Sequence, residues 1–308
     1  MCASPVKDEA VLELPAAVRA LYPYASRRLT VGGLSYHYID EGAGEPLLML
    51  HGNPTWSFYY RGLINGLKGE YRTIAPDHIG CGLSEKPDDS RYRFTLEQRV
   101  NDVEALVEHL GLGDNITLVL HDWGGMIGMA YAARHPHKIK RLILGNTAAF
   151  KLPATKPLPP SIKLCRSGAV GPLLVRGFNA FSRGAASSCV TRQPLSKAVR
   201  DGYLAPYDSW HNRRAVLRFI QDIPLKPNDY SYDLLESVEA SLAKFRHTPT
   251  LILWGAQDFV FDDHFLNVWL KWLPHAEVHR FADAGHYIFE DATDDVLPLI
   301  GDFLDRHP

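Results

Sequence analysis

Apolar and polar positions follow two different patterns along this chain of 308 residues. Short apolar runs predict buried strands at 46–50, 71–75, 116–120, 139–144 and 250–254, and 277–281 is expected as a further strand. Apolar residues at helical spacing predict a helix over 95–110, with Thr95 as its N-cap and Gly111 as its stop signal. Strands that alternate with helices predict an α/β fold, with a mostly parallel central sheet flanked by helices.

The pattern changes after Phe150. Residues 151–160 are rich in proline and lysine, and 161–232 show helical segments and turns but no convincing strand. We therefore predict a helical cap at 151–228, inserted into a core formed by residues 1–150 and 229–308. Residues 28–38 alternate around Gly32 and Gly33, which predicts a hairpin at the edge of the sheet.

The composition and charge of the chain limit the classes of partner and the cellular compartment that we expect. A formal net charge of -2 and a pI near 6.7 give no reason to expect nucleic acid or an anionic membrane as a partner. Residues 1–9 contain no apolar segment typical of a signal peptide, and no run is long enough to span a bilayer. The four cysteines are scattered and read as free thiols, so a cytoplasmic protein is expected; they are Cys2, Cys81, Cys165 and Cys189. Since no glycine-rich phosphate loop or metal-ligand cluster is present, we predict no cofactor.

Residues 116–130 have the sequence of a nucleophile elbow, a sharp turn from a strand into a helix that lifts one side chain above the sheet. The residue at the turn is Asp122, preceded by His121 and followed by Trp123 and two glycines. A carboxylate at this position cannot form the acyl-enzyme of an esterase, but it can attack an electrophilic carbon and form an alkyl-enzyme ester. Leu120 occupies a position where many such turns have a small residue.

Two later residues complete a set in the chain order nucleophile, acid, histidine. Asp258 follows the strand at 250–254, and His286 follows Gly285 in a late loop. We expect Asp122 to be the nucleophile, His286 the general base and Asp258 the carboxylate that orients the imidazole. An aspartate after a strand is often only a helix N-cap, and structural roles are expected for Asp77 and His121.

Asn53 and Trp123 are candidates for binding the leaving group. Their backbone N–H groups are placed to form an oxyanion hole, and both side chains carry a neutral N–H donor. Two uncharged donors in an apolar pocket suit a halide that departs as an anion.

Four motifs together resemble the haloalkane dehalogenases of the α/β-hydrolase superfamily. They are His51-Gly-Asn-Pro-Thr-Trp56, Asp77-His-Ile-Gly-Cys-Gly-Leu-Ser84, His121-Asp-Trp-Gly-Gly125 and Gly285-His286. The resemblance implies hydrolysis of carbon–halogen bonds in small apolar halogenated substrates through an ester on Asp122, giving alcohol and halide. One subgroup of that family has a glutamate where this chain has Asn146, so the pairing of Asp258 with Asn53 resembles the third subgroup.

The same branch includes the β-lactone decarboxylases, which form long-chain cis-olefins from lactones with the same aspartate nucleophile. Stretches of the expected cap also resemble theirs: Asn146-Thr-Ala-Ala-Phe150, Phe178-Asn-Ala-Phe181, Ala205-Pro-Tyr-Asp-Ser-Trp210 and Gln221-Asp-Ile-Pro-Leu225. The choice between dehalogenase and decarboxylase stays open at this point.

Two other functions fit the sequence less well. An epoxide hydrolase needs acidic tyrosines in the cap, for which Tyr203 and Tyr207 are candidates, but Asn53 departs from the apolar residue usual there. A non-catalytic binding protein is disfavoured by the intact set of Asp122, Asp258 and His286. Five aromatic residues are candidates to line a pocket under the cap, although aromatic residues in a helical cap more often hold it to the core: Phe150, Phe178, Phe181, Trp210 and Phe219.

Overall fold

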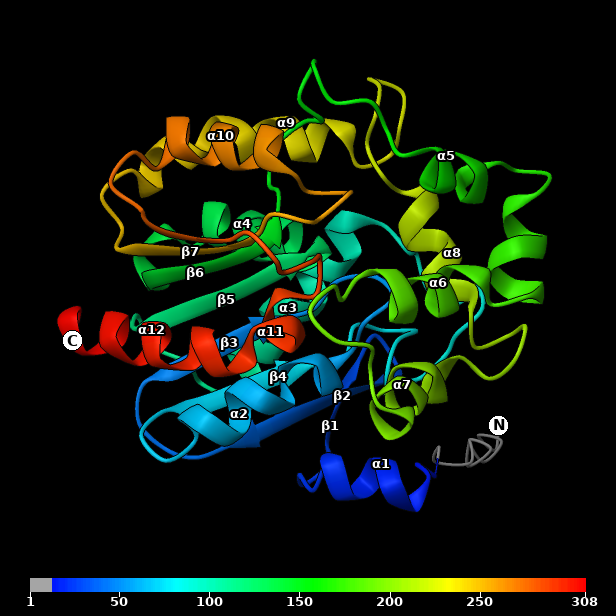
Figure 1. The fold of residues 1–308 in the computed structure, drawn as a ribbon, viewed down its shortest axis with the longest axis horizontal. Helices are drawn as coiled ribbons and strands as arrows, with labels where there is room; N and C mark the ends of the chain where they lie inside the picture. Colours follow the sequence, from blue (N-terminus) through cyan, green and yellow to red (C-terminus); the bar gives the residue numbers. More distant parts are fainter. Residues whose placement is uncertain (1–12) are drawn as a thin grey trace, which may run out of the picture.

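A computed structural model describes residues 13–308 and has an eight-stranded sheet at its centre (Figure 1). The strand order is β1-β2-β4-β3-β5-β6-β7-β8; β2 pairs antiparallel with β1 and β4, and the other neighbours are parallel. The strands are β1 (Arg27–Val31), β2 (Leu34–Glu41), β3 (Pro46–Leu50), β4 (Arg72–Pro76), β5 (Ile116–Asp122), β6 (Ile139–Thr147), β7 (Thr250–Gly255) and β8 (Glu277–Phe281). The predicted α/β-hydrolase fold with a mostly parallel sheet is therefore confirmed. The interpretations that concern residues 1–9, Cys2 included, lie outside the described residues.

Helices cover both faces of this sheet. One face packs against α3 (Leu96–His109), α4 (Trp123–Arg134), α9 (Tyr232–Ser241) and α10 (Asp263–Trp272). The other packs against α1 (Ala16–Leu21), η1 (Ser57–Tyr60), α2 (Arg61–Leu67), α11 (Ile288–Asp291) and α12 (Thr293–Arg306). The central strands are buried on both sides because their residues alternate between the two cores. Leu48 and Leu50 of β3 belong to the first core, whereas Leu47 and Met49 belong to the second.

The predicted ends of the helix at 95–110 are observed in α3. The side-chain oxygen of Thr95 accepts a hydrogen bond from the Gln98 N–H at 3.3 Å, which satisfies one free donor of the first turn. Gly111 follows the helix with φ +59°, a conformation that glycine adopts without a steric penalty. No helix within residues 13–308 is long and apolar enough to cross a membrane. Cys81, Cys165 and Cys189 are buried free thiols.

Between β6 and β7 the described chain forms helices and turns but no strand. The helices there are α5 (Pro160–Arg166), the π-helical turn η3 (Leu173–Gly177), α6 (Ala180–Ser188), α7 (Lys197–Leu204), η4 (Ala205–Tyr207), α8 (Arg214–Gln221), α9 and, after it, η5 (Leu242–Phe245). Figure 1 shows α5, α6 and α8 together on one side of the molecule, whereas α7 lies on the same side but next to α1. We refer to residues 151–228 as the insert; its role as a cap remains a prediction.

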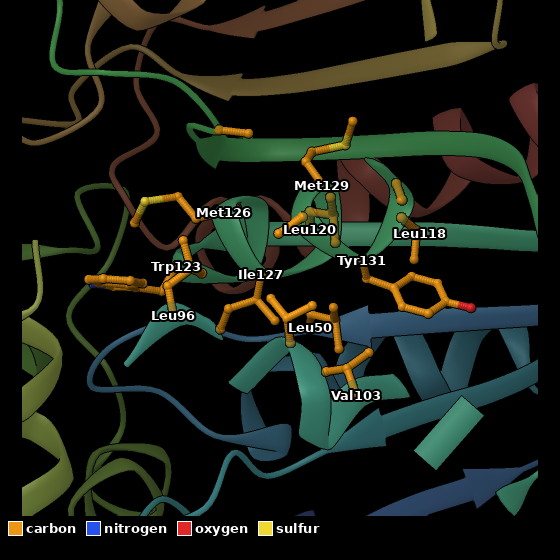
Figure 2. Packing of buried hydrophobic residues seen from close by; sticks show 14 of the residues in the cluster. Leu50, Leu96, Val103, Leu118, Leu120, Trp123, Met126, Ile127, Met129 and Tyr131 are labelled. Atoms are coloured by element: carbon orange, nitrogen blue, oxygen red, sulfur yellow. The ribbon is translucent and has the colours of Figure 1, made fainter. Parts of the chain in front are cut away.

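The structure explains how a leucine fits at position 120. Leu120 is fully buried beneath α4, in the cluster that also holds Leu50 and Ile127 (Figure 2). The helix residue that faces it is Gly128, where an added Cβ would lie 2.3 Å from Leu120 Cδ2. The bulk of Leu120 is thus accommodated by the missing side chain of Gly128, so the two positions are sterically coupled.

We expect Gly128→Ala to lower the free energy of unfolding by about 1–3 kcal/mol, because overpacking in a closed core outweighs the gain in helix propensity. In the background of Leu120→Ala, which by itself costs about 2–5 kcal/mol, the same change should be neutral or stabilising. Chemical denaturation of the four proteins of this cycle measures the coupling. The control is Gly184→Ala in α6, where an added Cβ meets nothing within 4 Å. Additive effects of the two core substitutions would contradict the steric account.

Candidate active site

Asp122 occupies a strained turn between β5 and α4. Its backbone has φ +51° and ψ −125°, a conformation that costs a non-glycine residue free energy. Two glycines make the turn possible. A Cβ at Gly124 would lie 1.8 Å from the Leu50 carbonyl oxygen, and one at Gly52 would lie 1.9 Å from Asp122 Oδ1. Gly124, two residues after Asp122, and Gly52, before Asn53, are therefore required by close approach.

The two oxygens of the Asp122 carboxylate have different surroundings. Oδ1 accepts the backbone N–H of Asn53 at 2.7 Å, and the backbone N–H of Trp123 also stabilises the charged carboxylate. Oδ2 faces the imidazole of His286, with 3.6 Å between Oδ2 and Nε2. Burial raises the pKa of Asp122 above its ordinary value, and the proximity of His286 opposes that rise. Oδ1 is thus held by a backbone donor, while Oδ2 faces the imidazole of His286.

His286 and Asp258 form a buried pair beside this carboxylate. Asp258 follows β7, and its Oδ2 accepts a hydrogen bond from His286 Nδ1 at 2.7 Å. The second oxygen, Oδ1, accepts the backbone N–H of Val260 at 2.7 Å, which fixes the carboxylate. Burial lowers the pKa of His286, but the charges of Asp258 and Asp122 together outweigh burial, so the net pKa is raised. The structure therefore brings the predicted residues Asp122, Asp258 and His286 together in the predicted order of contacts.

Asn53 and Trp123 both line the cavity above Asp122. The Asn53 amide donates to the Val216 carbonyl of α8 at 3.2 Å, and its Oδ1 is buried without a partner among the described residues. The ring of Trp123 packs edge-on against Phe219, with 5.2 Å between the ring centroids. Both residues thus lie at the cavity, the Asn53 amide is partly engaged by the insert, and their role as leaving-group donors stays a prediction.

The cavity has a volume of about 370 Å³ and lies between the insert and the carboxyl ends of the strands. Its lining is almost wholly apolar away from the Asp122 end. Residues on the insert side of the lining include Leu158, Ile162, Leu164, Cys165, Leu174, Phe181, Ala185, Cys189, Ile220 and Ile223. Leu164 and Phe259 line the cavity and are also exposed, at 50% and 43%, so they mark its opening to the outside.

Only two of the five aromatic residues predicted for this lining are found there, namely Phe150 and Phe181. Phe178 and Trp210 point outward, with 63% and 48% of their surface exposed. Phe219 is buried behind Trp123, under the guanidinium of Arg99 at 3.7 Å from its ring centroid. The prediction was wrong for these three, because the face that a helix turns inward depends on its packing and not on residue type.

Neither tyrosine considered for an epoxide hydrolase lines the cavity. The Tyr203 hydroxyl donates to Glu290 Oε2 at 2.6 Å, and the Tyr207 hydroxyl donates to the Thr55 carbonyl at 3.2 Å. Both rings are buried in packing contacts. The structure thus offers no acid from these residues for an epoxide oxygen.

Three polar residues near the site hold the structure together. Asp77 accepts hydrogen bonds from His37 and from the backbone N–H groups of Ser57 and Leu83, so it braces the loop after β4 as expected. His121 Nε2 donates to the His286 carbonyl at 2.8 Å, which anchors the loop that carries the His286 imidazole. The Asn146 side-chain amide donates to the Gly255 carbonyl, and its oxygen accepts the Gly255 N–H. These two hydrogen bonds join β6 to β7.

Phe261 is a residue of the site that was not predicted from the sequence. Its ring stacks on the imidazole of His286, with 5.8 Å between centroids and 18° between planes, and it also lines the cavity. It lies three residues after Asp258, in a loop with no periodic pattern that would have indicated its direction. Phe261 shields one face of the imidazole from water.

We expect Asp258→Asn to lower the pKa of His286, because the substitution removes a negative charge 2.7 Å from Nδ1. The measurement is an NMR titration of the histidine ring signals, with His286 assigned from the spectrum of His286→Phe. Asp262→Asn is the matched control, because Asp262 pairs with the exposed His264 and not with His286. A His286 pKa that is unchanged by Asp258→Asn would contradict the charge coupling.

Comparison with known proteins agrees with this geometry. The family described as alpha/beta hydrolase fold matches residues 45–293. The chain is 58% identical to a cis-3-alkyl-4-alkyloxetan-2-one decarboxylase of Shewanella oneidensis, over 92% of this chain and 89% of that protein. A decarboxylase of the same description from Xanthomonas campestris is 48% identical, over 93% of this chain and 98% of that protein.

Haloalkane dehalogenases are also similar. Haloalkane dehalogenase 2 of Mycobacterium tuberculosis is 33% identical, over 91% of this chain and 95% of that protein. The crystal structure of the haloalkane dehalogenase DatA from Agrobacterium tumefaciens superposes with a TM-score of 0.83 at 26% identity, over 92% of this chain and 97% of that one. The fold, the site and these similarities lead to one conclusion: the chain belongs to the alpha/beta-hydrolase family of enzymes.

Proposed function

We propose that this protein decarboxylates cis-3,4-dialkyl β-lactones to cis-alkenes, with Asp122 as nucleophile. The observation that carries the proposal is the sequence identity of 58% and 48% to two proteins of that description. The aligned residues cover 92% and 93% of this chain, so they include the insert as well as the core. The apolar cavity that ends at Asp122 supports it, because two alkyl chains need an apolar environment beside the reacting ring. In this proposal the insert, residues 151–228, is the cap that closes the site.

The first chemical step is attack of Asp122 Oδ2 on C4 of the lactone. The bond between C4 and the ring oxygen breaks, and its electrons stay on that oxygen as a carboxylate attached to C3. The product is an ester between Asp122 and C4. The backbone N–H of Asn53 holds Oδ1, which becomes the carbonyl oxygen of this ester, 2.7 Å away in the free protein.

The second step needs no water. The bond from C3 to the carboxylate breaks, its electrons form the C3–C4 double bond, and the C4–oxygen bond returns its electrons to Asp122. Carbon dioxide and an alkene leave, and the Asp122 carboxylate is regenerated. Attack with inversion places the ester opposite the carboxylate, so elimination in that arrangement leaves both alkyl groups on the same side of the alkene.

The remaining site residues have defined parts in this scheme. The neutral N–H donors of Asn53 and Trp123 line the cavity where the ring oxygen departs as part of a carboxylate. His286, whose pKa is raised by Asp258 and Asp122, favours the charged form of Asp122 both as nucleophile and as leaving group. Asp258 positions the imidazole through the bond to Nδ1.

Haloalkane dehalogenase, the first expectation from the sequence motifs, is the second candidate. Asn53 and Trp123 at the cavity end and the DatA-like fold favour it. Asp122 would displace a halide and form an alkyl ester, and neutral His286 would activate water to hydrolyse that ester to an alcohol. Both reactions form an alkyl ester on Asp122. The decarboxylase resolves this ester by elimination, whereas the dehalogenase hydrolyses it.

A paired assay tests the choice. We expect the purified protein to form alkene from a long-chain cis-β-lactone and to release little or no halide from 1-bromohexane and 1,2-dibromoethane. Asp122→Ala should abolish alkene formation, with a loss of roughly ten-thousand-fold or more, while circular dichroism shows an intact fold. Asp114→Asn, an exposed aspartate, is the control. Brisk halide release without alkene would establish the dehalogenase instead.

Isotope labelling tests the water-free second step. During turnover of the lactone in H₂¹⁸O we expect the peptide that contains Asp122 to stay unlabelled, because the carboxylate is regenerated by elimination. Hydrolysis of an alkyl ester would place ¹⁸O in Asp122. His286→Phe should still yield alkene from the lactone without a lasting adduct, as read by intact mass. An adduct that accumulates with no alkene formed would show that His286 and water are required.

A further inference from the structure

The net charge of the whole chain conceals a strong asymmetry. The insert, residues 151–228, contains 13 lysines and arginines but only three aspartates and no glutamate, a formal charge of +10. Because the chain as a whole carries -2, the remaining residues together carry -12. The net charge of the whole chain averages these two parts. The expectation that an anionic surface is no partner therefore does not hold for the insert alone.

Many of these cations are not neutralised within the protein. Arg214 and Arg218 share a single carboxylate, that of Asp89. Six others have no carboxylate within 4 Å among residues 13–308: Lys163, Arg176, Arg183, Arg200, Arg213 and Lys226. The insert therefore presents uncompensated positive charge to its surroundings.

Large apolar side chains are exposed among these cations. Leu173 and Phe178 are 54% and 63% exposed, and Trp210 is 48% exposed. Trp210 differs from the other five tryptophans, which are buried or nearly so. A single exposed apolar residue is ordinary, but a group of three on one small insert requires an explanation.

The contacts place these residues on one surface. The Arg176 guanidinium lies over the Trp210 ring, 4.5 Å from its centroid, and the Arg176 Nε donates to the Trp210 carbonyl. Arg213 donates to the Arg176 and Gly177 carbonyls, and Gly177 lies between Leu173 and Trp210. We name this surface the insert patch and define it as Leu173, Arg176, Phe178, Arg183, Trp210 and Arg213.

The positive charge in and around the insert patch lowers the pKa of two of its arginines. Burial and the nearby guanidinium of Arg183 lower the pKa of Arg213, and burial and Arg214 lower that of Arg176. Two acids oppose these shifts: Asp208, whose carboxylate accepts a hydrogen bond from Asn212, acts on Arg213, and Asp89, which pairs with Arg214 and Arg218, acts on Arg176. Like charges held this close destabilise the free protein and are relieved by an anionic counterpart.

We propose that the insert patch docks the protein on an anionic membrane surface. Basic side chains attract anionic lipid headgroups, and tryptophan and phenylalanine insert at the headgroup boundary. An acidic protein partner would satisfy the arginines but leaves the exposed Phe178 and Leu173 without a reason. The combination of cations with protruding aromatic side chains is that of a membrane-surface anchor.

The position of the patch also suits delivery of an apolar substrate. Leu174 and Phe181 line the cavity, whereas their neighbours Leu173 and Phe178 face outward. The same turn of η3 and the start of α6 thus contact the cavity on one side and the surroundings on the other. Docking here brings the cavity wall next to the bilayer, where long-chain molecules are concentrated. The proposal does not depend on which of the two reactions the protein catalyses.

Co-sedimentation with vesicles tests the docking. We expect binding to vesicles of phosphatidylglycerol and phosphatidylcholine, weak binding to phosphatidylcholine alone, and loss of binding as salt concentration rises. Arg183→Ala should weaken binding about fivefold, whereas Lys271→Ala, a cation of α10 outside the patch, should not. Phe178→Ser combined with Trp210→Ser should weaken binding at least about tenfold, and Phe178→Trp should preserve it. Thermal unfolding of each variant verifies the fold.

Fluorescence supplies a second readout that reports the orientation. Brominated lipids should quench the wild-type protein on docking, and this quenching should be lost in Trp210→Phe if Trp210 enters the interface. Absence of binding to anionic vesicles, or equal losses in Arg183→Ala and Lys271→Ala, would overturn the proposal. A dimer in solution that disappears in the Phe178→Ser, Trp210→Ser variant, without vesicle binding, would overturn it in favour of self-association.

Discussion

The left-handed backbone at Asp122 is the constraint on which the site depends. Holding a non-glycine residue at φ +51° costs about 1–3 kcal/mol, and the surroundings must supply that free energy. They do so through the close approach of Gly124 to the Leu50 carbonyl and through the N–H of Asn53, which holds Oδ1. The same contacts leave Oδ2 directed at the cavity and at His286. The backbone strain at Asp122, the placement of the glycines and the direction of Oδ2 are therefore one feature of the molecule.

What could be predicted from the sequence is what depends on local signals. The apolar run of β3 and the cap at Thr95 act on residues close in the chain, so their patterns indicated the sheet and the helix. The glycines after Asp122 indicated the turn as part of a local motif, although the contact that requires Gly124 is with the distant Leu50 carbonyl. Which aromatic residues line the cavity could not be predicted. Phe178 and Phe181 are three residues apart, yet one is exposed and the other lines the cavity, because the packing of α6 and η3 on other elements sets their direction.

The chemistry shows a second limit of sequence reasoning. Asp122, His286 and Asp258 were correctly expected to lie together, but the same contacts serve an elimination or a hydrolysis. In either proposed reaction, the neutral N–H donors of Asn53 and Trp123 would receive the departing group, a halide or a carboxylate. What decides the outcome is whether the substrate carries a carboxylate beside the ester carbon, and that property belongs to the ligand. Similarity over the insert, which lines the cavity, is therefore more informative than the motifs around Asp122 and His286.

The insert, residues 151–228, has an apolar inner side and a strongly charged outer side. Its inner side is apolar because it encloses the cavity, with small residues such as Ala180 and Gly184 of α6 at the wall. A short helix with an apolar inner face and exposed apolar side chains beyond it would aggregate in water unless charge surrounds them. Cations of one sign, such as Arg183 and Arg176, prevent that association by repulsion. Since acidic residues would prevent it equally well, the choice of positive charge indicates a negatively charged surface as the place where the insert works.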